Sequence, residues 1–296
     1  MIVRNLTLLA FAVIGMCSAQ TVDPIPGTRP FRLGFTRWPA DLTWEGVQTA
    51  IDFAHAHGDI VSVMFVGGIP WAEALDGKPF AKDVNDKFKD LAPAGKKLFL
   101  SISPLAMDRK SLAPNWGEKD NMPLAKPWDQ LALNSPAVKK AYLNFTLRAV
   151  EAMEPDYLAI GIESNCCLSH DPGKWEQLKE LHRETYTAVK TSHPNLPVCF
   201  TTEVNHYKKL ATEAKSRDQV GEVADLMKYS GLFAMSVYPH MTYEIPRPIP
   251  ADFFDFATTF KKPIAVAESG MTSRNVDLKS FGVTLRGSDA DQVQFT

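Results

Sequence analysis

The alternation of short apolar segments with longer helical patterns is the feature that most limits how this chain can fold. We expect strands at Arg32–Thr36, Ile60–Val66, Lys97–Ile102, Tyr157–Ile162, Val198–Thr202, Leu232–Val237 and Ile264–Ala267. Helical or polar stretches separate these seven segments. Sustained alternation of this kind indicates a parallel β-sheet with helices packed outside it. The second segment, IVSVMFV, is apolar on both faces, as buried parallel strands are.

Two of the intervening helices are clearly marked. Ser135 followed by Pro136 is a typical N-cap and first-turn pair, and apolar residues then recur at helical spacing as far as Met153. The segment Lys174–Thr191 carries its apolar residues on one face and most of its charged residues away from it. A further helix is expected to begin at 288–290, close to the end of the chain.

The pattern favours a closed barrel over an open doubly wound sheet. No glycine-rich phosphate loop follows the first strand, and polar or aromatic residues come directly after almost every strand. We therefore predict an α/β fold, the (β/α)8 TIM barrel, with its chemistry at the carboxyl ends of the strands. Seven strands are visible. The chain ends at Thr296, and we expect the eighth strand to be missing because the sequence is truncated at its C-terminus.

The first residues are typical of a signal peptide. Arg4 gives a positive start, Leu8–Met16 is apolar but too short to span a bilayer, and small residues follow at 17–19. We expect cleavage after residue 19, a secreted or periplasmic protein, and no membrane attachment after cleavage. Residues 20–296 are then one catalytic TIM-barrel domain with an incomplete C-terminus. A lipid anchor on Cys17 is the alternative, although Met16 precedes that cysteine where a small residue is required.

Composition narrows the class of partner. Apolar residues make up 45% of the 296 residues and charged residues 22%, as in a globular protein with a sizeable core. The formal net charge is −2 at pH 7, so nothing favours nucleic acid or an anionic membrane as a partner. We expect a monomer.

Two glutamates follow apolar strands directly. Glu163 ends the fourth expected strand (YLAIGIES) and Glu268 ends the seventh (PIAVAESG). A carboxylate placed there is costly unless it is paired, hydrogen-bonded or used. Retaining glycosidases need two carboxyl groups roughly 5–5.5 Å apart, one as proton donor and one as nucleophile. The alternative is that each glutamate only marks the turn from a buried strand into a solvated loop.

Three segments carry a resemblance to clan A of the glycoside hydrolases: AIGIES at 159–164, MSVYPH at 235–240 and KPIAVAESGM at 262–271. Within that clan the chain looks most similar to the endo-β-1,4-galactanases, and next to a group of β-mannanases. The resemblance implies a (β/α)8 barrel and a retaining glycosidase that acts on an oligo- or polysaccharide.

The same resemblance implies roles for three residues. Glu163 matches the acid/base, Glu268 matches the nucleophile, and Tyr238 matches the tyrosine that holds the nucleophile. An amphipathic core tyrosine is the alternative for Tyr238. Most of the clan has Asn immediately before the acid/base, where this chain has Ile162. The mannanase-like group also lacks that Asn. The absence of that Asn therefore does not exclude activity. Because of Ile162 and the missing eighth strand, a non-catalytic carbohydrate-binding barrel derived from such an enzyme is the alternative function.

Five more residues near strand ends are candidate substrate-binding residues. Trp38 and Trp71 could stack on a sugar ring, or simply pack in the core. Arg37 could bind a sugar hydroxyl or the nucleophile, or form a surface salt bridge. Glu203 follows the fifth strand and could hydrogen-bond substrate or pair with Arg37. His240 could contact sugar, although a histidine in that position is more often exposed in a loop.

The cysteines allow two interpretations. Once Cys17 is removed, Cys166, Cys167 and Cys199 remain, either as three thiols or as one disulfide and a spare thiol. Both stay open. A disulfide from the 166–167 loop, with Cys199 as a possible partner, is more plausible than a metal site at these cysteines. No metal or cofactor is expected, because hydrolysis by paired carboxylates needs none. The adjacent cysteines with His170 and His206 are the alternative metal site, and a metal-dependent barrel hydrolase using His170, His206 or His240 is the corresponding function.

Overall fold

The computed structural model describes residues 29–39, 41, 43–89, 95–279 and 282–295. The expected signal peptide and Cys17 lie outside the described residues. Within the described part of the chain, no helix is both long enough and apolar enough to cross a membrane.

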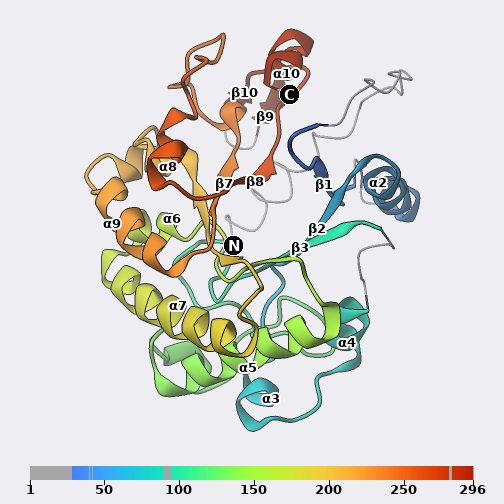
Figure 1. The fold of residues 1–296 in the computed structure, drawn as a ribbon, viewed down its shortest axis with the longest axis vertical. Coiled ribbons are helices and arrows are strands. Elements are labelled where there is room, and N and C mark those ends of the chain that lie inside the picture. The colour runs from blue at the N-terminus through green and yellow to red at the C-terminus, as the bar shows by residue number, and fades with distance from the viewer. Residues whose placement is uncertain (1–28, 40, 42, 90–94, 280–281, 296) are drawn as a thin grey trace.

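Parallel strands form the centre of the molecule (Figure 1). A five-stranded sheet has the order β1-β2-β3-β4-β5, and a three-stranded sheet has the order β6-β7-β8. Every pairing in the two sheets is parallel. The strands are β1 Gly34–Thr36, β2 Ile60–Phe65, β3 Lys97–Ile102, β4 Tyr157–Ala159, β5 Val198–Cys199, β6 Thr201–Glu203, β7 Phe233–Val237 and β8 Ile264–Ser269. All seven expected strands are thus present, because β5 and β6 are two pieces of one of them, separated by Phe200.

Two stretches differ from expectation. The strand β4 ends at Ala159 rather than Ile162, because the backbone turns toward Glu163, whose φ is +49°. No strand is expected after Ala267, yet the stretch after β8 contains an antiparallel hairpin of β9 Val276–Leu278 and β10 Val283–Leu285. These strands are too short for a period-two pattern to reveal them. The helix expected near 288–290 is confirmed as α10, Asp289–Phe295.

Helices cover the outside of the strands (Figure 1). In α5, Pro136–Met153, the Ser135 hydroxyl accepts the Val138 N–H as predicted. The structure also contains α2 Trp44–His57, α3 Trp71–Asp76, α4 Lys82–Phe88, α7 Pro172–Ser192 and α9 Gln219–Leu226. A 3₁₀ segment, η5, spans Asp255–Phe260.

Alternate residues of each central strand contribute to two different apolar clusters. Leu98 and Leu100 of β3 belong to the large cluster that includes the helices. Phe99, between them, belongs to a smaller cluster with Ala159, Cys199, Leu232 and Ala234. This alternation follows from the two-residue period of a strand. The second cluster holds mostly small side chains.

The structure corrects two expectations about the core. Trp71 is fully buried, its indole N–H donates to the Ala113 carbonyl at 2.9 Å, and its ring stacks on Trp128. It therefore packs in the core and has no face to offer a sugar. The disulfide to Cys199 is absent as well, because Cys166, Cys167 and Cys199 are all free and buried.

Candidate active site

The backbone at Glu163 adopts a conformation that side-chain-bearing residues rarely take. Its φ of +49° lies in the left-handed region. The strand β6 holds it there: the Glu163 N–H donates to Thr201 Oγ1 at 2.7 Å, and the Ser164 N–H donates to the Thr201 carbonyl at 2.9 Å. Strain of this kind persists only where surrounding contacts impose it, and it is common at active sites.

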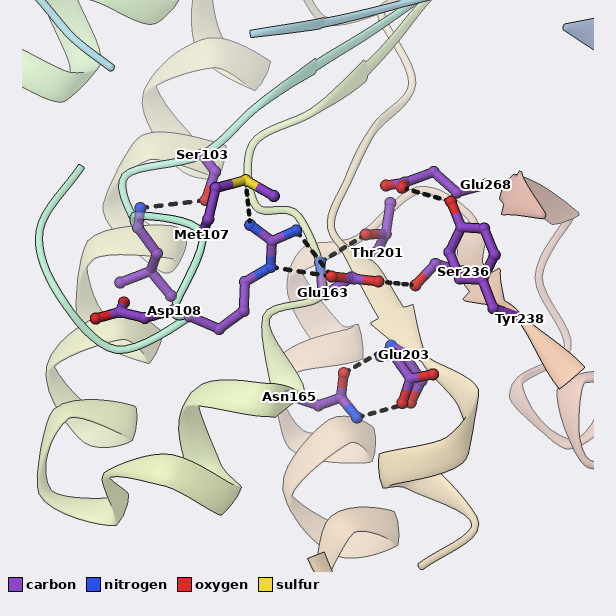
Figure 2. Close-up of polar contacts among 12 residues, drawn as sticks. Ser103, Met107, Asp108, Glu163, Asn165, Thr201, Glu203, Ser236, Tyr238 and Glu268 are labelled. Atoms are coloured by element: carbon purple, nitrogen blue, oxygen red, sulfur yellow. Dashed lines mark hydrogen bonds and ion pairs between the residues drawn. The ribbon is translucent and has the colours of Figure 1, made fainter. Parts of the chain in front are cut away.

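The Glu163 carboxylate accepts three hydrogen bonds (Figure 2). Arg109 donates to Oε2 from both Nε, at 3.0 Å, and Nη2, at 2.8 Å. Ser236 of β7 donates to Oε1 at 2.8 Å. Charged hydrogen bonds of this type are the strongest in proteins. They fix the carboxylate between the loop after β3 and the end of β7.

Arg109 faces both predicted catalytic glutamates. The residue is buried, and its φ is +55°. Burial acts to lower the pKa of Arg109, but the charges of Glu163 and Glu268 outweigh that effect, so its pKa is raised. Arg109 is thus a fixed positive charge shared between the two carboxyl groups.

Glu268 reaches the site through an irregularity in β8. Met235 pairs with Val266, but the next residue, Ser236, pairs with Glu268, so Ala267 is skipped. Such a bulge changes which face of the sheet a side chain points to, and bulges are common beside active sites. Without it, Ala267 would lie opposite Ser236 in place of the glutamate.

The Glu268 carboxyl group is buried, with only one of its oxygens hydrogen-bonded. Tyr238 donates its hydroxyl to Oε2 at 3.1 Å (Figure 2). The other oxygen, Oε1, is buried and has no hydrogen-bond partner among the described residues. Burial raises the pKa of Glu268 to about 8, the charge of Glu163 adds to the increase, and Arg109 and Tyr238 oppose it. Glu268 is therefore a weaker acid in the free protein than an ordinary glutamic acid side chain.

Glu203 lies beside this pair, and its role is partly structural. Its carboxylate accepts the His206 N–H at 2.7 Å at the start of α8, Val204–Tyr207. Its backbone N–H and carbonyl both bond the Asn165 side chain. Burial raises the pKa of Glu203 to about 8, with a further contribution from the charge of Glu163. The partner suggested for Glu203 was Arg37, but the contacts observed are with α8 and Asn165.

The remaining candidate site residues lie in different surroundings. His240 is buried rather than exposed, and its Nδ1 lies 3.2 Å from the Gly270 carbonyl, just after Glu268. Burial lowers its pKa to about 4, so it is neutral at physiological pH. Arg37 and Trp38 are half-buried directly after β1. The structure brings Tyr238 to Glu268 and places Trp71 in the core.

Three residues of the site are not among those expected from the sequence. Ser236 lies within the MSVYPH segment, two residues before Tyr238, so period-two alternation could have identified it as facing the same side. Thr201 lies in a predicted strand, and its polar side chain was the available signal. Arg109 lies 54 residues before the glutamate it contacts, in a loop with no pattern. No local signal could have found it.

Among the residues that the structure describes, two groups of side chains could hold a metal ion. Cys166, Glu203 and His206 form one group, and His170, His206 and Glu213 form the other. In each group the potential ligand atoms all lie within 4.8 Å of one another.

Comparison with known proteins gives one family. The family model described as "Glycosyl hydrolase family 53" matches residues 115–294, which is more than half of the chain. No curated protein matches the sequence significantly.

Two glycoside hydrolases are among the solved structures to which the chain is similar. A family 53 catalytic domain from Ignisphaera aggregans is 20% identical with a TM-score of 0.48, and the match covers 79% of this chain and 63% of that one. An exo-β-1,4-mannosidase from Opitutaceae bacterium strain TAV5 is 14% identical with a TM-score of 0.50, covering 84% and 47% respectively. The chain thus spans less than two thirds of either protein. At these identities the likeness concerns the fold alone.

Proposed function

This chain belongs to glycosyl hydrolase family 53, and from that premise we propose that it is a retaining glycosidase acting on β-linked glycans. Family membership implies a (β/α)8 barrel, and the parallel strands with helices outside them agree with that fold. We assign Glu163 as acid/base and Glu268 as nucleophile. The observation that supports this most is geometric: Ser236 of β7 donates to the Glu163 carboxylate and pairs with Glu268 in β8, so two glutamates from distant parts of the sequence meet at one serine.

The geometry at Glu268 suits a nucleophile. Tyr238 binds Oε2, which leaves Oε1 available to attack the anomeric carbon. In the first step Glu268 attacks while Glu163 donates a proton to the departing oxygen. In the second step Glu163 takes a proton from water, and the water releases a sugar of retained configuration.

The reaction needs a different proton distribution from that of the free protein. In the free protein burial raises the pKa of Glu268, and Glu163 is paired with Arg109. Attack requires the proton on Glu163 and a charge on Glu268. We propose that glycan binding moves Arg109 from Glu163 toward Glu268. The guanidinium then stabilises the charged nucleophile, and Glu163 is released to take the proton.

The proposed substrate is an oligo- or polysaccharide, and the proposed location is outside the cytoplasm. Residues 1–19 have the composition of a signal peptide, and an exported glycosidase meets polymers rather than metabolites. We propose that residues 20–296 act as one catalytic domain, as a monomer. Trp38 and Arg37, directly after β1, remain the candidate substrate contacts, with Glu203 and His240 close to the carboxyl pair.

The test is turnover with the product anomer observed. The chain and its Glu268→Ala variant are assayed by NMR against aryl β-glycosides and polymeric β-glycans. Retention in the parent and loss of at least about 10³-fold in the variant are expected, as for removal of a catalytic group. Azide added to the variant should restore release of an aryl leaving group and give an inverted glycosyl azide. An inverted sugar from the parent chain would contradict the assignment.

A non-catalytic carbohydrate-binding barrel is the second candidate. The observation that favours it is the ion pair between Arg109 and Glu163, which occupies the group that should donate a proton. The presence of Ile162 before Glu163 agrees with it. Binding of a glycan in affinity electrophoresis without turnover, by a chain that is folded by circular dichroism, would support this candidate over the enzyme.

A further inference from the structure

A second cluster of chemically active side chains lies on the far side of the Arg109 loop. His170 ends α6, Asn165–His170, and His206 lies in α8. Glu213 lies in the 3₁₀ segment η2, Thr212–Ala214. These three elements pack against one another. None of the three side chains has a role in the proposed reaction.

The two imidazole rings are oriented by their Nδ1 atoms. His170 Nδ1 lies 3.0 Å from the Asp108 carbonyl, which can only accept, so this nitrogen carries the hydrogen. His206 Nδ1 lies 2.8 Å from Ser169 Oγ. In both rings Nε2 is therefore the nitrogen left to face Glu213. Metal-binding histidines are typically held in this way, by a second partner on the other ring nitrogen.

Both Nε2 atoms face the same carboxylate oxygen. Glu213 Oε1 lies 3.5 Å from Nε2 of His206 and 3.8 Å from Nε2 of His170. These distances are too long for good hydrogen bonds, which fall at roughly 2.7–3.2 Å. Zinc bonds of about 2.0–2.1 Å in a tetrahedral site place neighbouring ligand atoms roughly 3.4 Å apart. The spacing fits a shared ion better than direct hydrogen bonding.

We propose that His170, His206 and Glu213 bind a zinc ion, with water completing its coordination. Two imidazole nitrogens and one carboxylate oxygen are ligands that zinc accepts, whereas calcium and magnesium prefer oxygen ligands throughout. The His170 and Glu213 side chains are 29% and 49% exposed, so an ion can enter from solvent. This site departs from the sequence-based expectation of no metal, and it does not depend on the proposed glycosidase activity.

The position of the site gives the ion a structural consequence. His170 holds the carbonyl of Asp108, the residue immediately before Arg109. An ion on Nε2 of His170 would fix the ring, and through it the loop that carries Arg109 to Glu163. The proposed ion therefore stabilises the position of this loop and takes no part in cleavage of the glycosidic bond.

The buried group Cys166, Glu203 and His206 is the competing site. Because His206 belongs to both groups, a His206 variant cannot distinguish them. The Glu203 carboxylate already accepts the His206 N–H, and Cys166 is buried. Variants of Cys166 and Glu213 separate the two sites, since each residue belongs to one group only.

The experiment is isothermal titration of zinc chloride into chelator-treated, dialysed protein. One zinc per chain is expected, with no matching heat from magnesium or calcium. Glu213→Gln and His170→Ala should each weaken binding by at least about tenfold, since each removes one ligand. Cys166→Ala should bind as the parent does. His57→Ala, an exposed histidine on α2, is the matched control for incidental histidine binding and should also be unchanged.

A spectroscopic measurement supplements the titration. Cobalt(II) in place of zinc should give visible ligand-field bands without a thiolate charge-transfer band, because no cysteine is a ligand. Absence of zinc binding to the folded parent chain would overturn the proposal. Binding lost in Cys166→Ala but kept in Glu213→Gln would overturn it in favour of the buried group. Binding equal in all variants, His57→Ala included, would show nonspecific association only.

Discussion

At the residue scale, the site is defined by how charge is shared among a few buried side chains. Arg109 contacts Glu163, while Glu268 is left with a raised pKa and one unpartnered oxygen. This arrangement of charge is the reverse of what the reaction needs, because attack requires a charge on Glu268 and a proton on Glu163. The proposed roles of the two glutamates therefore require the rearrangement of Arg109 that we propose for substrate binding.

The first prediction concerns the pH dependence of kcat/KM. Burial raises the pKa of Glu268 to about 8, so its carboxyl group loses its proton as the pH rises above that value. The reactive form carries one proton. We expect kcat/KM to decline above about pH 8, approaching tenfold per pH unit. A decline that begins near pH 5, as for an ordinary carboxylic acid, would contradict the raised pKa.

The second prediction concerns Tyr238. Changing Tyr238 to Phe removes the hydrogen bond to Oε2 of Glu268. A hydrogen bond to a charged group is worth about 1.5–3 kcal/mol, so kcat should fall roughly 10- to 150-fold while KM changes little. Tyr243→Phe, on an exposed tyrosine, is the control and should leave kcat unchanged. Equal kcat for the parent and Tyr238→Phe would exclude a role for this bond in catalysis.

At the scale of elements, β6 supports the strained backbone at the end of β4. Thr201 and Thr202 are adjacent in this strand and both fully buried, but their hydroxyls differ. Thr201 Oγ1 accepts the Glu163 N–H, whereas Thr202 Oγ1 has no partner among the described residues. The pair therefore offers two identical substitutions with opposite expected effects.

The third prediction uses this pair. Thr201→Val leaves the Glu163 N–H without its partner and should lower the free energy of unfolding by roughly 1–3 kcal/mol. Thr202→Val removes a hydroxyl that has no partner and should be neutral or stabilising. Urea denaturation of the two variants measures the difference. Only Thr201→Val is expected to reduce activity, because it loosens Glu163. Equal destabilisation by both would show that burial alone decides the cost.

At the scale of the whole molecule, buried ionisable groups should make the free energy of unfolding depend on pH more steeply in some pH ranges than in others. Glu203 and Glu268 have pKa values raised to about 8, so the folded chain keeps their protons up to that pH, while the unfolded chain releases them near 4.5. Both groups therefore lower stability as pH rises from about 4.5 to 8. His182 and His240 have pKa values lowered to about 4, which raises stability between about 4 and 6.5.

The fourth prediction follows from the balance of these groups. Between about pH 4.5 and 6.5 His182 and His240 offset Glu203 and Glu268, so the free energy of unfolding should change little there through these four groups. Between 6.5 and 8 only the glutamates act, and the free energy of unfolding should fall by at most about 1.4 kcal/mol per pH unit for each. Urea denaturation at several pH values measures the slope. Glu268→Gln should remove about half of it, and an unchanged slope in this variant would contradict the raised pKa of Glu268.

Much of the fold and the carboxyl pair could be predicted from the sequence, because both depend on local pattern. Apolar segments such as Ile60–Phe65 identify a buried strand by themselves, and Glu163 and Glu268 are recognisable because each directly follows one. Ser135 and Pro136 mark the start of α5 for the same reason. These signals lie within a few residues of the feature they predict.

The tertiary structure alone decided what each side chain touches. Trp71 follows a strand just as Trp38 does, yet it is buried against Trp128. Arg109 lies in a loop without pattern, yet it holds Glu163, and Glu213 faces His170 and His206 from another segment. Local pattern cannot specify such contacts, because they depend on how distant segments pack. The sequence determined which parallel strands form and where the two glutamates lie along the chain. Packing determined the charges of the glutamates and the side chains that they contact.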